Sequence, residues 1–124
     1  MSIVVAVPGN VQQPASLKLP NTSVNDVLSL SVDTSGGVTT VIGIVIVNQD
    51  AAVQKVTVWW NDGAADYALF ERSVGANDTV TVALDAPIVL YTKVTAKKIK
   101  AQAAKADAVT VTVLYTLASQ RAQA

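Results

Sequence analysis

Residues 109–113 read Val-Thr-Val-Thr-Val, and the shorter form Val-Thr-Val stands at residues 56–58 and again at 80–82. Successive side chains of an extended chain point to opposite faces, so this alternation puts valines on one face of a sheet and threonines on the other. Segments of this kind follow one another along most of the chain, separated by short turns rich in Gly, Asn and Asp. The pattern predicts an all-β fold: an antiparallel β-sandwich of about eight strands, in a jelly-roll or immunoglobulin-like order.

The expected strands are separated by glycine, proline or small polar residues. They cover residues 24–32, 38–48, 53–60, 67–74, 79–84, 88–92, 98–103 and 108–117. Residues 38–48 are apolar on both faces, which predicts a strand at the centre of its sheet or beneath another subunit. Residues 97–107 also suit a helix by propensity, but an isolated helix this short is marginal and we prefer a strand.

The first 22 residues differ from the rest of the chain. Pro14 and Pro20 favour extended or turn backbone and do not suit a central strand. The apolar tip at residues 2–7 needs a partner, either the chain's own sheet or the sheet of a neighbour. The expected organisation is an extended N-terminal arm (1–22), a β-sandwich (23–118) and a polar C-terminal tail (119–124).

The chain contains no histidine and no cysteine. It therefore lacks the commonest general base, the commonest thiol nucleophile and the best zinc ligands. Turn positions explain Asp62 and Asp78. The loop with Asp62 and Asp66 offers two carboxylates, which are too few for a calcium site. The remaining candidate acids, Asp66 and Glu71, form no pair that specifies hydrolysis. The sequence predicts a protein that is not an enzyme and holds no cofactor or metal.

The composition is apolar for a chain of this size, with 51% hydrophobic and 15% charged residues, which favours a surface partly covered by an interface. Acids predominate in residues 19–92 and bases in residues 93–121. The basic part is either a solvated lysine rim on an edge strand or one of two complementary faces between copies. No aromatics are interleaved with the lysines, and the longest apolar run has seven residues. We expect neither nucleic-acid nor membrane binding.

Trp59 and Trp60 are adjacent on one expected strand and should face opposite ways. Trp60 shares its face with Val56 and Val58, so we assign it to the core. Trp59 is then covered by its own chain, buried in a subunit interface, or exposed as a platform for sugar rings. The candidate interface residues lie on the arm, on the outer face of the central strand and at this outward tryptophan. They are Ile3, Val4, Val5, Val7, Val41, Val45, Val47 and Trp59.

Residues 38–117 resemble a class of small, cysteine-poor β-sandwich virion proteins of tailed bacteriophages. The resemblance rests on Ile-Val-Ile-Val-Asn at 44–48, Val-Thr-Val-Trp at 56–59, Pro-Ile-Val-Leu at 87–90 and the last Val-Thr-Val strand. Members often carry a Leu-x-x-Gly-Asp segment before the penultimate strand, where this chain has residues 93–98 instead.

The resemblance implies a virion structural protein on the capsid surface. Two roles are compatible with it: a capsid decoration (cement) protein that binds the major capsid protein and stabilises the head, or a neck or tail component. Together with the apolar composition, the two-faced strand and the arm, it favours self-association, with a homotrimer as the expected form. A carbohydrate-binding β-sandwich that uses Trp59 or Trp60 remains the alternative from the residues themselves.

Overall fold

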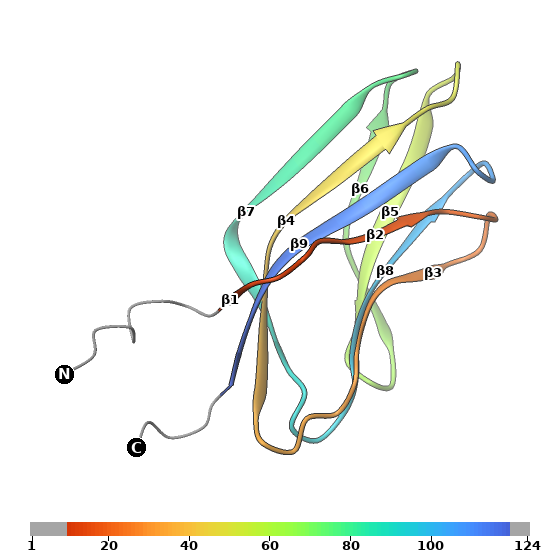
Figure 1. Cartoon of the computed structure of the whole chain (residues 1–124). Helices are drawn as coiled ribbons and strands as arrows, with labels where there is room; N and C mark the ends of the chain where they lie inside the picture. Colours follow the sequence, from red (N-terminus) through yellow and green to blue (C-terminus); the bar gives the residue numbers. More distant parts are fainter. Residues whose placement is uncertain (1–9, 120–124) are drawn as a thin grey trace.

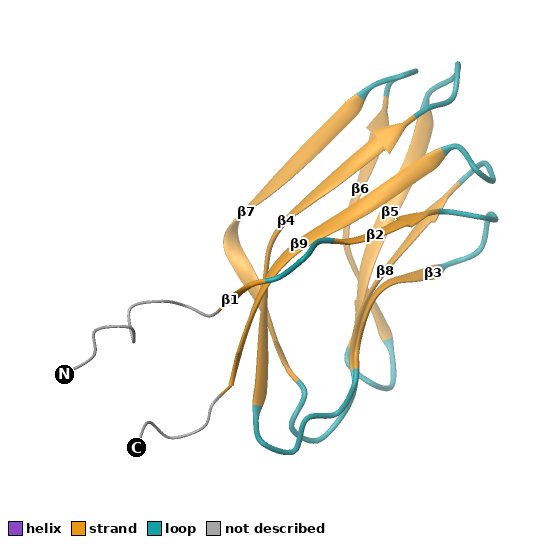
Figure 2. Cartoon of the chain, viewed as in Figure 1, coloured by secondary structure: helices purple, strands orange, loops and turns teal. Residues whose placement is uncertain are grey.

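The structure is a computed structural model that describes residues 10–119. The described residues form nine strands and no helix, which confirms the all-β prediction (Figure 2). The strands are β1 (Asn10–Val11), β2 (Ala15–Lys18), β3 (Asn25–Leu30), β4 (Gly37–Asn48), β5 (Gln54–Asn61), β6 (Asp66–Val74), β7 (Thr79–Tyr91), β8 (Lys97–Ala103) and β9 (Val109–Ser119). The segment that also suited a helix is the strand β8, as preferred.

Two antiparallel sheets pack face to face as a sandwich (Figure 1). The first sheet has the order β1-β9-β4-β7, with β2 also paired to β9, and the second has the order β3-β8-β5-β6. The strand that is apolar on both faces, β4, lies between β9 and β7, which confirms its predicted central place. Core side chains come from both inner faces, and the largest fully buried ones are aliphatic. They are Leu19, Ile44, Ile46, Leu90, Ile99, Val41, Val56, Val58, Val74, Val109, Val111 and Val113.

Residues 10–18, which the sequence assigned to the arm, lie on the edge of the first sheet. β1 pairs with the end of β9 and β2 with its beginning. Leu19, directly after β2, is completely buried. It continues the alternation of β2, in which Ala15 and Leu17 face the core and Ser16 and Lys18 face solvent. Pro14 and Pro20 flank β2, where an edge strand tolerates them. This part of the arm pairs with its own sheet, whereas the tip with Ile3, Val4, Val5 and Val7 lies outside the described residues.

A β-bulge in the central strand β4 shifts by one residue the set of side chains that face the core. The register shifts directly after Val41 on both neighbouring strands. Val41 is completely buried, Ile42 is 43% exposed, and Ile44 is buried again. The assignment of Val41 to the same outer face as Val45 and Val47 was therefore wrong, because one extra residue shifts the alternation by one.

The strand β7 is bent and its pairing is interrupted (Figure 1). Its ladder with β4 stops at Ala83 and resumes at Ile88, so residues 84–87 bulge between the two halves. Pro87 has no N–H group to donate to a ladder, which explains the break that the sequence predicted at this place. The two expected strands are thus two halves of one bent strand.

Among the described residues, Thr116 carries a buried hydroxyl without a hydrogen-bond partner. The residue is only 5% exposed. An unpaired buried hydroxyl costs roughly 1–3 kcal/mol, so Thr116→Val is expected to raise the free energy of unfolding by about 1 kcal/mol. Urea unfolding followed by tryptophan fluorescence measures the change. Thr112→Val is the control, because the Thr112 hydroxyl is 2.7 Å from that of Ser16; equal effects of both changes would contradict the assignment.

Candidate functional site

The outer face of the first sheet carries an uncharged surface of valine, threonine and small residues on the half above the bend of β7 (Figure 1). Three rows cross β7, β4 and β9 there: Thr79–Val47–Thr110, Thr81–Val45–Thr112 and Ala83–Gly43–Leu114. We call these nine residues the Val/Thr face. None is charged, and the neighbouring charges lie at its border: Lys18 on the edge strand β2, opposite Thr110, and Asp78 in the turn before Thr79. The three residues on β7 are exposed, and those on β4 and β9 are half-buried apart from the buried Gly43. An outward sheet face without charges is typical of a protein contact surface.

The outer face of the second sheet has the opposite character, since its charges form pairs across the strands. The pairs are Lys98–Asp26 at 2.9 Å, Lys100–Asp66 at 3.2 Å and Lys55–Glu71 at 3.1 Å. The strand with Lys98 and Lys100, β8, lies between β3 and β5. The interpretation of these lysines as a rim on an edge strand was therefore wrong. Exposed pairs of this kind add little stability, and a face covered by them is well solvated.

Two of the acids considered for catalysis organise turns. Asp62 accepts hydrogen bonds from the backbone N–H groups of Ala65 and Ala64, both at 2.8 Å, and these two donors lower the pKa of Asp62. Asp78 accepts the N–H group of Thr79 at 2.8 Å. Such contacts are those of turn residues, as the sequence predicted.

The other two acids lie in the polar network of the second sheet. The Asn61 amide, 2.7 Å from Asp66, and then the Lys100 ammonium lower the pKa of Asp66. Glu71 pairs with Lys55. Within residues 10–119, no three His, Cys, Asp or Glu residues come together in a group that could hold a metal ion.

Acid should destabilise the fold through carboxylates whose pKa is lowered. Beside Asp66 and Asp62 these include Asp50, whose pKa is lowered because Lys105 and then Gln54 donate hydrogen bonds to it. A carboxyl with a lowered pKa stabilises the folded state above its unfolded pKa, and the contribution disappears as the pH falls through the folded value. We expect thermal midpoints that are flat between pH 5 and 8, where no histidine titrates, and that fall below about pH 4.

Thermal unfolding at one fixed protein concentration, between pH 2 and pH 8, checks this expectation. Lys105→Met serves as the matched variant: loss of this donor moves the pKa of Asp50 back toward its usual value, so the midpoint near neutral pH should be lower and its fall on acidification smaller. A midpoint that rises on acidification from pH 5 to pH 3 would contradict the assignment.

The two tryptophans face opposite ways, as predicted. Trp60 packs partly buried against the core, and its ring centroid lies 5.4 Å from that of Tyr67. Trp59 lies half-buried on the charged outer face, level with Ala68 on one side and Lys100 on the other. Trp59 is therefore on the other side of the sandwich from the Val/Thr face.

The predicted interface residues thus separate into four places. Val45 and Val47 come together at the centre of the Val/Thr face. Val41 lies in the core and Trp59 on the charged face. The four residues of the arm lie outside the described part of the chain.

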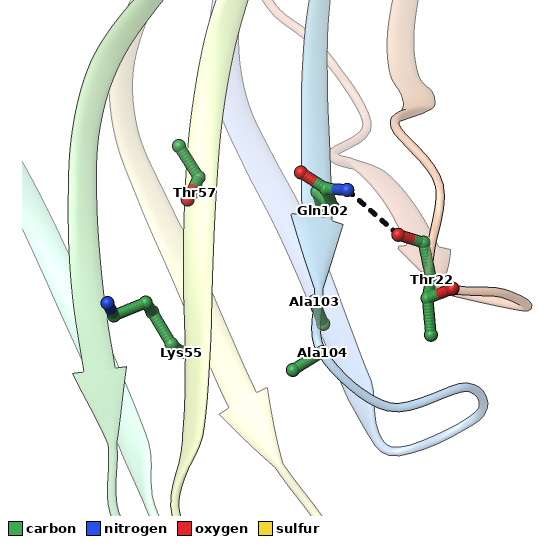
Figure 3. A pocket seen from close by; sticks show the side chains of 6 residues that line it. All are labelled: Thr22, Lys55, Thr57, Gln102, Ala103 and Ala104. Carbon is green, nitrogen blue, oxygen red and sulfur yellow. Dashed lines mark hydrogen bonds between the residues drawn. The ribbon is translucent and has the colours of Figure 1, made fainter.

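A shallow groove of about 230 Å³ lies on the charged face (Figure 3). Its lining residues are Thr22, Lys55, Thr57, Gln102, Ala103 and Ala104. The Gln102 amide donates to the backbone oxygen of Thr22 at 2.8 Å, and Lys55 is paired with Glu71. Because these polar groups already bind one another, the groove offers little to a ligand.

A larger groove, of about 350 Å³, follows the second half of β7. We call it the edge groove, and its lining residues are Trp60, Val89, Leu90, Tyr91, Lys93, Val94 and Lys97. Sequence reasoning missed it because the lining joins β5, β7, the loop after β7 and the first residue of β8. The available signal was the uncharged run at residues 88–91, which follows Pro87.

No protein-family model and no curated protein matches this sequence. Among solved structures, the chain is similar to that of infectious bursal disease virus Gx strain, with a TM-score of 0.36 and 14% identity over 88% of this chain and 29% of that chain. The VP2 subviral particle of infectious bursal disease virus gives a TM-score of 0.32 and 12% identity, over 84% of this chain and 29% of that chain. This chain therefore spans less than a third of the length of those viral chains, and a likeness at this level carries no conclusion about function. The described residues include no helix able to cross a membrane.

Proposed function

We propose that this chain is a non-enzymatic structural protein of a virus particle, and specifically a decoration (cement) protein on the head of a tailed phage. The observation that carries the proposal is the contrast between the two outer faces of the sandwich. The Val/Thr face has no charge, whereas the face of the second sheet is covered with ion pairs. The resemblance of residues 38–117 to phage virion proteins points the same way.

The Val/Thr face suits a contact with the capsid shell. Its hydroxyl and methyl groups lose water at little cost, because no ion has to be desolvated. Apolar area buried there contributes roughly 25 cal/mol per Å², and a shell presents the same binding site many times. In this arrangement the charged face of the second sheet points to solvent and keeps the decorated particle soluble.

A neck or tail component is the second role compatible with the resemblance. The two roles differ in copy number, which is on the order of hundreds for a head decoration protein and about six to a dozen for a ring. The carbohydrate-binding alternative has less support, since Trp60 packs against the core and Trp59 lies between an alanine and a lysine. An unchanged tryptophan fluorescence across a panel of polysaccharides would exclude it.

The proposal is tested by mixing the purified chain with empty heads of the virus that encodes it. Saturable co-sedimentation with the heads, together with a higher temperature of head disruption, is expected. Heads that sediment without the chain at micromolar concentration would overturn the proposal. Light scattering on the free chain tests the homotrimer, which would have a mass of about 39 kDa from three 12.9 kDa chains.

A further inference from the structure

The outer edge of β7 differs from the other edges of the sandwich. Among the described residues β7 pairs only with β4, so its other side has free backbone groups. Both paired halves, residues 79–83 and 88–91, lack charged side chains. Natural edge strands are usually protected from pairing with another chain by charges, prolines or bulges.

The other three edges carry such protection. The edge strand β3 contains Asp26, and β6 contains Asp66, Glu71 and Arg72. The edge strand β2 ends at Lys18 and is flanked by two prolines. On β7 the one acid, the proline and the bulge are all confined to residues 84–87, where Asp85 and Pro87 stand, and an uncharged half is left on either side.

The second half of the β7 edge also has a place for side chains. The edge groove runs beside residues 88–91, with Trp60 and Leu90 among its lining. Val89 is 43% exposed, Tyr91 53% and Val94 82%. A strand added to this edge would gain backbone hydrogen bonds and a groove for alternate apolar side chains.

We propose that residues 3–7 of a second copy of this chain add as a strand to residues 88–91 and fill the edge groove. This inference rests on the proposed function, for which it names a second copy as one of the partners. The segment reads Ile-Val-Val-Ala-Val, with no charge and a high β-propensity. Its backbone carbonyls offer acceptors to Lys93, which lines the edge groove and forms no ion pair within residues 10–119, whereas the Lys97 ammonium already donates to Thr95.

The place where the described chain begins favours a second copy over the chain's own edge. β1 and β7 lie on opposite sides of the first sheet, separated by β9 and β4, which amounts to about 14 Å. Crossing that distance takes about four residues, so residues 6–9 would span the sheet and residues 6 and 7 would not pair with the chain's own edge. The crossing segment would also leave its backbone groups unpaired above the sheet. In a second copy all of residues 3–7 can pair, and repetition of this head-to-tail contact gives a ring such as a trimer where the rotation between copies closes.

Cysteine cross-linking in trans tests the proposal, since the chain has no cysteine of its own. A Val5→Cys chain is mixed with a ¹⁵N-labelled Val89→Cys chain, and a short bismaleimide is added. The expected product is a mixed covalent dimer of about 26 kDa, from two chains of 12.9 kDa, which the label identifies. Val53→Cys replaces Val89→Cys in the control, because Val53 is 62% exposed and lies outside the edge groove.

The outcomes separate this proposal from the proposed function. A mixed dimer at least about tenfold more abundant than in the control supports the strand addition. Equal yields with Val89→Cys and Val53→Cys would overturn it, and so would intrachain closure of a Val5→Cys/Val89→Cys chain at monomer mass. Head binding without trans cross-links would leave the decoration role standing alone, whereas trans cross-links without head binding would leave only self-assembly.

Discussion

Asn48→Asp is expected to lower the free energy of unfolding by about 4 kcal/mol, a large part of the stability of a domain this size. Asn48 is completely buried, and its amide nitrogen donates to three backbone oxygens at 2.9–3.1 Å. Its side-chain oxygen accepts the N–H group of Asp50 at 2.9 Å. These bonds join the β4–β5 loop to the β6–β7 turn. The carboxylate of this variant would still accept the hydrogen bond from Asp50. It would also place a buried negative charge beside three backbone oxygens that have lost their donor.

Urea unfolding followed by the fluorescence of the two tryptophans measures this effect. Asn21→Asp is the matched control, because Asn21 is exposed and its side-chain oxygen only accepts, from the backbone of Ser23 and the amide of Asn25. The control should stay within about 0.5 kcal/mol of the natural chain. Equal stabilities of the two variants would show that the Asn48 network does not hold the loops together.

The double change Val45→Glu with Val47→Glu is expected to weaken binding to virus heads at least 100-fold, by about 3 kcal/mol or more. Both residues lie at the centre of the Val/Thr face, between threonines of β7 and β9. Two carboxylates there would have to lose their water in the contact, and the penalty for desolvating unpaired charges is several kcal/mol. The isolated fold should survive, because both side chains point away from the core.

The control for this change adds the same charge to the other side of the sandwich. Ser29→Glu with Ser73→Glu places two acids on the charged face, opposite Lys98 and Lys55. Co-sedimentation with heads should be unchanged for this variant, and circular dichroism should show an all-β spectrum for both. Full binding by the Val45/Val47 variant would contradict the assignment of the Val/Thr face.

Much of the fold follows from local patterns. The Val-Thr alternation predicted the strands, the two-faced run at residues 38–48 predicted the central strand, and Trp60 was assigned to the core from its spacing to Val56 and Val58. These predictions succeed because a period of two fixes which face a side chain takes. The prediction that Asp62 and Asp78 are turn residues is also confirmed, since each accepts a hydrogen bond from the backbone of its own loop.

Other features depend on contacts that a linear pattern does not contain. A single extra residue at Ile42 moved Val41 from the outer face to the core, and bulges have no strong local signal here. The edge strand β2 was not predicted, because Pro14 and Pro20 also fit an extended arm. Prolines exclude a segment from the centre of a sheet but not from its edge. The edge groove depends on the approach of Trp60 to β7, residues that are about 30 positions apart in the sequence.

The most direct test of the central claim is the number of copies of this chain in purified particles of the virus that encodes it. Quantitative mass spectrometry against the major shell protein gives this ratio. The account predicts on the order of hundreds of copies per particle, as expected for a unit that repeats over the head. Particles without the chain, or with only about six to a dozen copies, would contradict a decoration role.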